Sequence, residues 1–258
     1  MIIISASFFL CMHTLLERAR DGLFALFYPT PCRVCGKIID SWDDGIACAE
    51  CWKTSVWPAA TQFCGKCDLP LPSTIVPLPN KYCGTCDETA FARARAGGPY
   101  SGAWRESVIW MKSHPQIAPR IEKRLLTIFT ELAEIEPIET ILPIPLHPQR
   151  EAERGFNQAE VIALALSRAT DVRLNLTSLE RVRATSPHRA GLDAIERKRS
   201  LQGAFRVRAP RLIAGRAVLL IDDVMTTTAT AHEAAAALCG AGAKSVNVLT
   251  LARVAYAP

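Results

Sequence analysis

The sequence predicts an α/β protein in which helices flank a parallel sheet, preceded by a small cysteine-rich domain that binds metal. Two observations predict this fold class. In the second half of the chain, apolar runs of strand length alternate with segments of helix length, which is typical of βαβ units. In the first third, eight of the ten cysteines fall into four Cys-x-x-Cys pairs. Hydrophobic residues form 49% of the chain and charged residues 21%, a composition that excludes a disordered protein.

The 258 residues divide into three segments. Residues 1–28 are expected to form an N-terminal helix with an uncertain start, residues 29–90 the cysteine-rich domain, and residues 91–258 the α/β domain. The first eleven residues are apolar, but they lack a basic start and a cleavage site and are too short to span a bilayer. Met12 is therefore an alternative start, and we expect a cytoplasmic protein without a membrane span.

The expected elements of the α/β domain follow from apolar spacing. Helices are predicted at residues 100–112 (after a bend), 117–133, 158–168 and 230–239. Strands are predicted at residues 138–145, 176–181, 204–207, 217–222 and 245–252. Residues 184–201 are basic and lack a pattern, so we expect a mobile loop that runs into a short helix.

The apolar strand at residues 217–222 leads into two acids, a threonine-rich turn and a helix. A strand that ends at the carboxyl edge of an α/β sheet delivers its last side chains to a ligand crevice. There Asp222 and Asp223 can accept hydrogen bonds from two ribose hydroxyls, directly or through Mg²⁺. The turn offers backbone N–H groups, hydroxyls and a helix dipole to a 5′-phosphate; its residues are Thr226, Thr227, Thr228, Ala229 and Thr230. Alternatively, the threonines only cap the helix and the acids end the strand in solvent.

The segment IDDVMTTTAT resembles the motif with which type I phosphoribosyltransferases bind 5-phosphoribosyl-1-pyrophosphate (PRPP). The resemblance implies a type I phosphoribosyltransferase-like sheet, in which the acids bind the ribose hydroxyls and the turn holds the 5′-phosphate. This chain has Thr228 where the family usually has glycine, and a positive φ there would strain a β-branched residue. Several purine enzymes also have an acid at the position of Thr226, so base-assisted purine chemistry is not implied here.

A second motif, PIPLHPQREAERGFNQ, places arginines after the strand at residues 138–145. Arg150 and Arg154 are suited to bidentate contacts with pyrophosphate. The alternative is a solvated basic start of a helix, with Gly155 as a bend. Lys112 either joins the same anion site or lies on the plain surface.

The cysteine pairs form two sets of four. Each set can close one tetrahedral Zn²⁺ site, which predicts about two structural zinc ions; the ligands are Cys32, Cys35, Cys48 and Cys51, and Cys64, Cys67, Cys83 and Cys86. Spacing alone leaves a cross-braced pairing open. Three tryptophans in this region, Trp42, Trp52 and Trp57, either stack on unpaired bases or support the small domain.

The order of cysteine pairs, Arg-Gly-Phe-Asn-Gln string and PRPP-type motif resembles the ComF family of competence-associated proteins, which includes GntX-like proteins. The match covers nearly the whole chain after Met12, with Thr228 and His188 as departures. The resemblance implies a role in the uptake and processing of single-stranded DNA during natural transformation, together with DNA-processing proteins. Whether the family catalyses a reaction is not settled by this resemblance.

Three functions are therefore open. The first is a ComF-type protein that binds PRPP with Mg²⁺, or a 5′-phosphorylated nucleotide, and acts with single-stranded DNA. The second is a metabolic phosphoribosyltransferase that acts on a base or an amine, and the third is a non-catalytic adaptor that senses nucleotide. The net charge of +5 is compatible with all three. A basic set could clamp pyrophosphate, bind DNA or form a solvated face; it comprises Arg189, Arg197, Lys198, Arg199 and Arg206.

Overall fold

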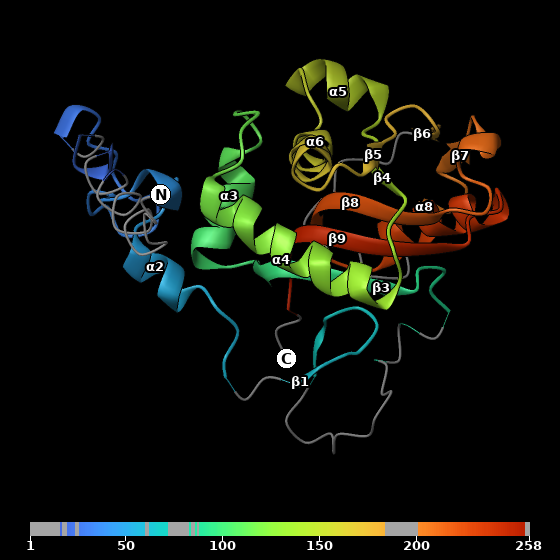
Figure 1. Ribbon diagram of the computed structural model, residues 1–258, viewed down its shortest axis with the longest axis horizontal. Helices are drawn as coiled ribbons and strands as arrows, with labels where there is room; N and C mark the ends of the chain where they lie inside the picture. Colours follow the sequence, from blue (N-terminus) through green and yellow to red (C-terminus); the bar gives the residue numbers. More distant parts are fainter. Residues whose placement is uncertain are drawn as a thin grey trace, which may run out of the picture.

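A parallel sheet forms the centre of the computed structural model. The structure describes residues 16, 20–23, 26–59, 62–71, 83, 86, 88–183 and 201–255. The five strands of the sheet are all parallel to their neighbours (Figure 1). In spatial order they are β3 (Arg93–Pro99), β9 (Ser245–Arg253), β8 (Ala217–Met225), β4 (Thr140–Pro143) and β5 (Arg173–Leu174). The predicted parallel sheet is confirmed.

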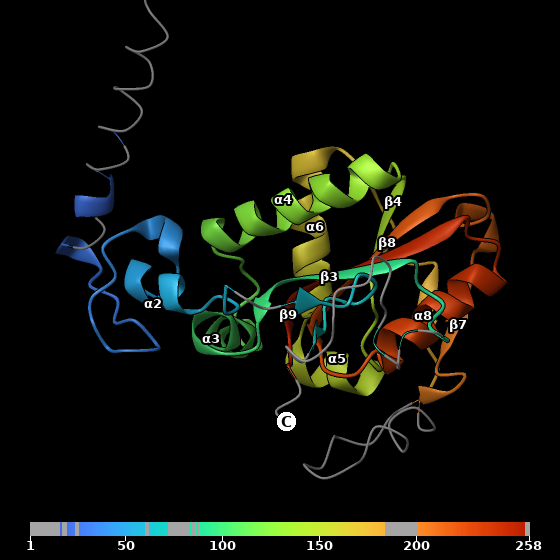
Figure 2. The same ribbon diagram turned by 90° about the horizontal axis from the view of Figure 1, so that it is seen from below.

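Helices cover both faces of the sheet because the residues of its central strands are apolar on both sides. On β8, Leu219 and Ile221 belong to the cluster formed with α3 (Gly102–Trp110), α4 (Pro119–Ile135) and α6 (Gln158–Thr170). The alternate residues Val218 and Leu220 pack in the cluster of α8 (Ala229–Gly240). Figure 2 shows α4 and α8 on opposite sides of the sheet.

The remaining elements are short. They are η1 (Trp42–Asp44), α2 (Ala49–Thr54), β1 (Gln62–Phe63), β2 (Pro70–Leu71), α5 (Pro148–Arg154), β6 (Leu179–Arg181), β7 (Phe205–Val207) and η2 (Pro210–Leu212). The described residues among positions 16–27 are helical. In the described part of the chain, no helix combines the length and the apolar character that crossing a membrane requires.

The cysteine-rich region packs directly against the sheet and its helices. Cys48, Cys51 and Trp52 belong to the same hydrophobic cluster as α3 and α4, whereas Cys64 and Cys67 belong to the cluster of α8. Helix α2, which carries Cys51 of the first set, lies beside α3, at the end of the molecule opposite β7 (Figures 1 and 2). Hydrophobic packing therefore continues across the predicted domain boundary at residue 90.

Several strands differ from the sequence-based expectations. The strands expected near residues 176–181 and 204–207 are β6 and β7, which pair antiparallel in a separate sheet. Strand β3 was not expected, because it contains Gly97 and Gly98, which usually weaken strands. Here they make room for the indole of Trp104: a Cβ on Gly98 would lie 2.1 Å from its Nε1. The predicted loop at 184–201 lies outside the described residues except for Leu201.

Candidate functional site

The neighbouring strands β4 and β8 are followed by helices on opposite faces of the sheet. After β4 the chain continues through α6 on one face of the sheet to β5, and after β8 it continues through α8 on the other face to β9. The chain therefore turns to opposite sides at neighbouring strands, and in open α/β sheets ligands bind at such a point, outside the carboxyl ends of the strands. Asp222 and Asp223 lie near the carboxyl end of β8, and Arg150 lies in α5, which follows β4.

The two aspartates are held by their own backbone. Oδ1 of Asp222 accepts the N–H of Asp223 at 2.9 Å, and Oδ1 of Asp223 accepts the N–H of Val224 at 2.7 Å. Burial raises the pKa of Asp222 well above its usual range, the charge of Asp223 raises it further, and the charge of Arg181 acts in the opposite direction. Because two carboxylates crowd one place, a metal ion or hydroxyl donors would relieve their repulsion.

This raised pKa gives a prediction about stability. A raised folded-state pKa means that the folded protein binds the proton more tightly than the unfolded chain does. The associated stability is present below the unfolded pKa and is lost as pH rises through the folded pKa. At neutral pH the acid therefore makes the ligand-free protein less stable than it is at acidic pH. Asp222→Asn removes the ionisable group and should raise the melting temperature, by roughly 2–4 °C for each kcal/mol.

The measurement is thermal unfolding without Mg²⁺ or phosphate, at neutral and at mildly acidic pH. The gain should shrink at acidic pH, where Asp222 is protonated in the wild type. Glu131→Gln, which removes an exposed acid of α4, serves as the control and should leave the melting temperature nearly unchanged. A lower melting temperature for Asp222→Asn at neutral pH would contradict the prediction.

Arg181 was missed by the sequence-based prediction. It ends β6, and its guanidinium lies 5.6 Å from the ring centroid of Phe205. Burial lowers the pKa of Arg181, the charge of Arg150 lowers it further, and the charge of Asp222 raises it. Arg150, Arg181 and Asp222 thus share one electrostatic neighbourhood. Nothing in the local sequence signals this, because the pairing of β6 with β7 brings Arg181 there.

The Arg-Gly-Phe-Asn-Gln string forms the corner between α5 and α6. Gly155 has a φ of 78°, which favours glycine, and ends α5. The side chain of Asn157 accepts the N–H of Ala159 at the start of α6 and donates to the carbonyl of Ile144 after β4, each at 3.0 Å. Nη1 of Arg154 donates to Oε1 of Gln158 at 2.9 Å. The string therefore fixes the corner and orients Arg154, which is half-buried.

The threonine-rich turn has a relaxed backbone. Thr228 has a φ of −76° and a ψ of −2°, and α8 begins at the next residue. The strain that a positive φ would impose on a β-branched residue is therefore not present. Oγ1 of Thr227 accepts the N–H of Ala229 at 3.5 Å, and Thr226, Thr227 and Thr228 are half-buried. The turn thus presents hydroxyls and the start of a helix at the carboxyl edge of the sheet.

In the part of the chain that the structure describes, the contacts of Lys112 do not connect it to the aspartates or the arginines described above. It follows α3 and is exposed, and its backbone N–H donates to the carbonyl of Ile109. Among the described residues, its side chain forms no hydrogen bond or ion pair with Asp222 or Arg150. A role for Lys112 in anion binding stays a prediction.

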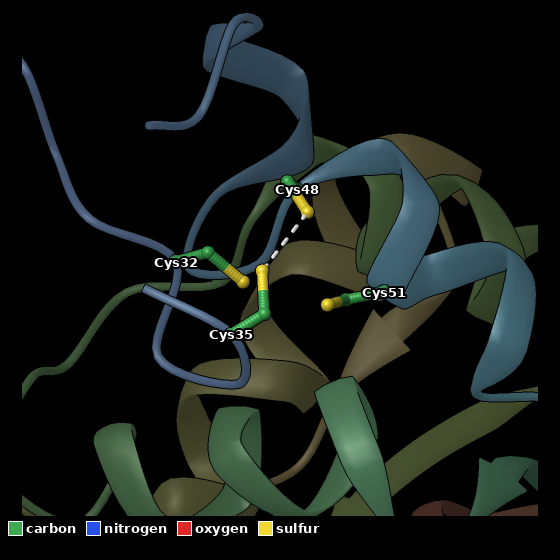
Figure 3. A group of neighbouring side chains, drawn as sticks. All are labelled: Cys32, Cys35, Cys48 and Cys51. Atoms are coloured by element: carbon green, nitrogen blue, oxygen red, sulfur yellow. Dashed lines mark hydrogen bonds between the residues drawn. The ribbon is translucent and has the colours of Figure 1, made fainter. Parts of the chain in front are cut away.

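The cysteines form two tetrads with the predicted membership. Within each tetrad the sulfur atoms lie within 4.8 Å of one another. The Sγ atoms of Cys35 and Cys48 are 3.7 Å apart (Figure 3), and those of Cys67 and Cys83 are 3.5 Å apart. Tetrahedral zinc with Zn–S bonds of about 2.3 Å places its sulfurs ~3.8 Å apart, whereas a disulfide requires about 2.05 Å. The geometry fits two structural zinc sites in tandem rather than a cross-braced pair.

One thiol in each tetrad has a lowered pKa, as expected of a metal ligand, and another has a raised one. Burial and then hydrogen bonds to neighbouring thiols raise the pKa of Cys51, and the hydrogen bond to Cys67 together with burial raises that of Cys86. Hydrogen bonding to Cys86 lowers the pKa of Cys67 to about 5; burial opposes this shift, and the charge of Arg253 supports it. For Cys32, burial raises the pKa, but hydrogen bonds from the backbone of Cys48, Cys35 and Val34 outweigh it, and the pKa falls to about 6. Thiolates held by backbone amides and a guanidinium are ready to bind metal.

A cavity of about 780 Å³ lies between α2, the end of β3 and α4. Among its lining residues are Arg120, Lys123 and Arg124 of α4, together with Trp57. Lys123 and Arg124 are exposed. This cavity is separate from the paired aspartates, which do not line it.

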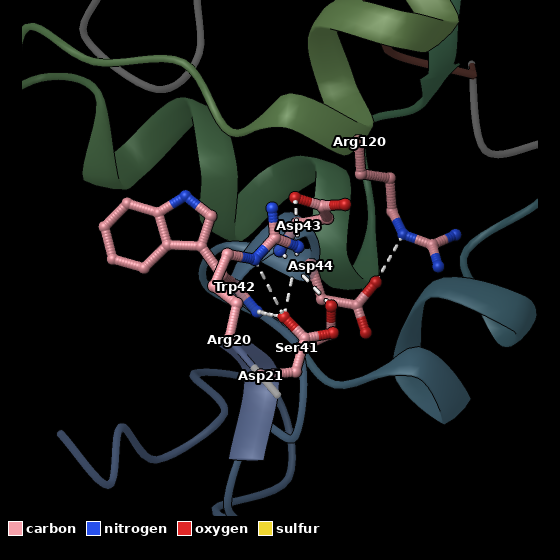
Figure 4. A network of polar contacts seen from close by, with 7 residues as sticks. All are labelled: Arg20, Asp21, Ser41, Trp42, Asp43, Asp44 and Arg120. Atoms are coloured by element: carbon pink, nitrogen blue, oxygen red, sulfur yellow. Dashed lines mark hydrogen bonds and ion pairs between the residues drawn. The ribbon is translucent and has the colours of Figure 1, made fainter. Parts of the chain in front are cut away.

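The acids of this cavity are already paired. Nε of Arg120 lies 2.6 Å from Oδ1 of Asp44, and Nη2 of Arg20 lies 3.1 Å from Oδ1 of Asp43 (Figure 4). Arg20 also contacts Asp21 at 3.1 Å. The same network therefore links residues 20–21, η1 and α4. Arg120 is occupied by Asp44, whereas no acid in the described part of the chain forms an ion pair with Lys123 or Arg124 of α4.

The three tryptophans have different roles. Trp52 is buried, meets Trp104 edge-to-face with centroids 5.2 Å apart, and donates its Nε1–H to the carbonyl of Asp44 at 2.9 Å. It supports the packing of the first tetrad on α3. Trp57 packs edge-on against Phe63 at 5.5 Å, whereas the side chain of Trp42 is exposed. Stacking on bases is thus open to Trp42 and to the accessible part of Trp57.

Comparisons with known proteins show which proteins this chain resembles. A model of the double zinc ribbon domain matches residues 23–87. The chain is 37% identical over 115 residues to DNA utilization protein YhgH of Escherichia coli K12, which covers 45% of this chain and 49% of that protein. It is 36% identical over 116 residues to competence protein F of Haemophilus influenzae, with 45% and 50% covered. It is a homologue of these competence and DNA utilization proteins.

This homology confirms the resemblance to the ComF family. This chain is also 36% identical over 117 residues to competence protein ComFC of Bacillus subtilis, with 44% of each chain covered. The chain spans about half the length of the curated relatives it matches. A similar solved structure is the purine phosphoribosyltransferase of Pyrococcus horikoshii, with a TM-score of 0.31 and 13% identity, covering 54% of this chain and 91% of that one. Another is the glutamine PRPP amidotransferase of Bacillus subtilis, with a TM-score of 0.33 and 17% identity, covering 54% and 29%.

Proposed function

We propose that the protein binds PRPP, or a 5′-phosphorylated nucleotide, at the carboxyl edge of its parallel sheet, and that it acts with single-stranded DNA. The observation that carries the proposal is the meeting of two arginines with an acid: Arg150 and Arg181 share a neighbourhood with Asp222. Like charges that influence one another are stabilised by a bound anion, whereas a neighbouring acid suits the polar sugar of the same ligand.

Each part of the ligand has its partners in this proposal. Asp222 and Asp223 hold the ribose hydroxyls and Mg²⁺. The 5′-phosphate lies on the turn before α8, where it meets hydroxyls and the N–H groups of the first helical turn; these residues are Thr226, Thr227, Thr228, Ala229 and Thr230. Arg150 and Arg154, joined by Arg181 and by Lys112, which follows α3, bind the pyrophosphate.

The test is calorimetric titration of the zinc-loaded protein with PRPP, ribose 5-phosphate and inorganic phosphate, each with and without Mg²⁺. PRPP with Mg²⁺ should bind most tightly, because only this ligand engages the acids, the turn and the arginines together. Equal affinity for inorganic phosphate would reduce the site to a simple anion site and overturn the proposal. Pyrophosphate release in the presence of a base or an amine would identify a phosphoribosyltransferase, and binding without release would identify a sensor.

For single-stranded DNA, the surface that we propose is the cavity beside α4. Its exposed cations, Lys123 and Arg124, are adjacent in the sequence and line the same cavity as Trp57. Cations track a phosphate backbone, and an aromatic ring stacks on an unpaired base. The names of the relatives, which refer to DNA utilization and competence, agree with such a ligand and with DNA-processing proteins as partners.

This part is tested with a fluorescent single-stranded oligonucleotide at several salt concentrations. Affinity should fall as salt rises, and Lys123→Glu/Arg124→Glu should weaken binding by at least about tenfold, because two phosphate contacts become repulsive. Arg211→Glu, at an exposed position in η2, is the control. If the double variant binds as tightly as the control, the cavity is not the DNA surface.

A further inference from the structure

Arg253 is an unusual residue for the interior of this protein. It ends β9, where it pairs with Met225 of β8 and Pro99 of β3. Only 1% of its surface is exposed, and it is among the largest fully buried side chains. A buried guanidinium destabilises a fold unless charged or polar groups compensate it. The position therefore requires a partner of opposite charge.

The partner that Arg253 reaches is a cysteine of the second tetrad. Its Nη2 donates to Sγ of Cys67 at 3.4 Å. Its Nε and Nη1 have no hydrogen-bond partner within the described part of the chain. The nearby Asp68 is engaged elsewhere: Oδ1 lies 3.5 Å from Nη1 of Arg95, and Oδ2 accepts the N–H of Ala96 at 3.2 Å. Cys67 is thus the principal contact of this buried cation.

The charge of a zinc site with four cysteines explains why a cation belongs there. Four thiolates and one Zn²⁺ carry a net charge of about −2. In the second tetrad all four cysteines are buried, so water cannot screen that charge. In the first tetrad Cys35 is exposed, and among the described residues no arginine or lysine donates to its sulfurs. The two sites therefore differ in how their charge is compensated.

We propose that Arg253 is a positioning residue of the second zinc site: it holds Cys67 as a ligand and compensates the negative charge of the buried tetrad. The hydrogen bond from Nη2 directs the thiolate toward the other sulfurs. Because Arg253 is the last residue of β9, the same contact ties this zinc site to the carboxyl edge of the sheet. Outer-shell hydrogen bonds of this kind orient metal ligands and commonly change metal affinity.

The test compares zinc release from the wild type with release from Arg253→Gln and Arg253→Lys. A chromogenic chelator reports the release of each zinc, and the first tetrad in the same molecule is the internal control. Arg253→Gln should release one of the two zinc ions at least about tenfold faster and leave the other unchanged. Arg253→Lys keeps the positive charge but lacks the planar fork of the guanidinium. It should therefore release the affected zinc ion at a rate between those of the wild type and Arg253→Gln.

Arg173→Gln is the matched control, because Arg173 is an exposed arginine of the same sheet; it should release both ions at the wild-type rate. Wild-type rates for both ions in Arg253→Gln would overturn the proposal, and so would equal acceleration of both, since that indicates general unfolding. If Arg253→Gln does not fold, Arg253→Lys decides on its own: selective acceleration of one ion supports the proposal, and unchanged or equally accelerated release overturns it.

Discussion

The double replacement Asp222→Asn/Asp223→Asn is expected to reduce the affinity for PRPP with Mg²⁺ by at least about a hundredfold. Asparagine keeps the size of each side chain but removes the charge that ribose hydroxyls and Mg²⁺ require. The loss corresponds to one or two charge-assisted hydrogen bonds, each worth about 1.5–3 kcal/mol. Calorimetric titration of the variant and the wild type at the same Mg²⁺ concentration measures the effect.

We do not expect loss of folding to produce this result, because the raised pKa of Asp222 predicts a more stable ligand-free protein for Asp222→Asn. A melting curve of the double variant, recorded beside the titration, tests that point. Glu131→Gln, the exposed control on α4, should bind PRPP like the wild type. Affinity of the double variant close to that of the wild type would mean that the acids do not hold the ligand.

The second large effect is expected from the second tetrad. Cys67→Ser/Cys86→Ser should reduce the zinc content from about two ions to one and should abolish cooperative unfolding near the wild-type temperature. Structural zinc contributes roughly 10–16 kcal/mol in small zinc domains, as much as the whole stability of a typical domain, about 5–15 kcal/mol. Elemental analysis and thermal unfolding followed by circular dichroism measure both effects.

The packing of this tetrad explains why the effect should reach the sheet. Cys67 and Cys86 are fully buried and share a hydrophobic cluster with Leu142, Leu220 and Ala234, which belong to β4, β8 and α8. The control is Cys239→Ser, since Cys239 is exposed and belongs to neither tetrad. If the double variant unfolds like this control although it has lost one zinc, the second tetrad does not stabilise the sheet.

Much of the fold could be predicted where the signal is local. The apolar run of β8 and the helix after the threonine-rich turn appear where they were expected, although β8 continues to Met225. The two tetrads could also be predicted, because a Cys-x-x-Cys turn brings both sulfurs to one side and the four pairs follow one another along the chain.

Other features could not be read from neighbouring residues. Strand β3 contains two glycines and few branched side chains, and it exists because β9 provides a partner and Trp104 occupies the space above the glycines. Arg181 comes into the electrostatic neighbourhood of Asp222 through the pairing of β6 with β7. Similarly, Thr228 suggested strain from its residue type alone, but the negative φ at this position removes that concern.

The sequence by itself determined the order of the parts: two sets of four thiols, then a strand with paired acids and a threonine-rich turn before a helix. It could do so because each motif is complete within a few residues, and its chemistry depends on local spacing. Only the tertiary structure decided which distant charges meet. Arg253 reaches Cys67 across 186 positions of the chain, and Arg181 comes under the influence of the charge of Asp222. Packing between separate elements, rather than the residues beside them, places each buried charge.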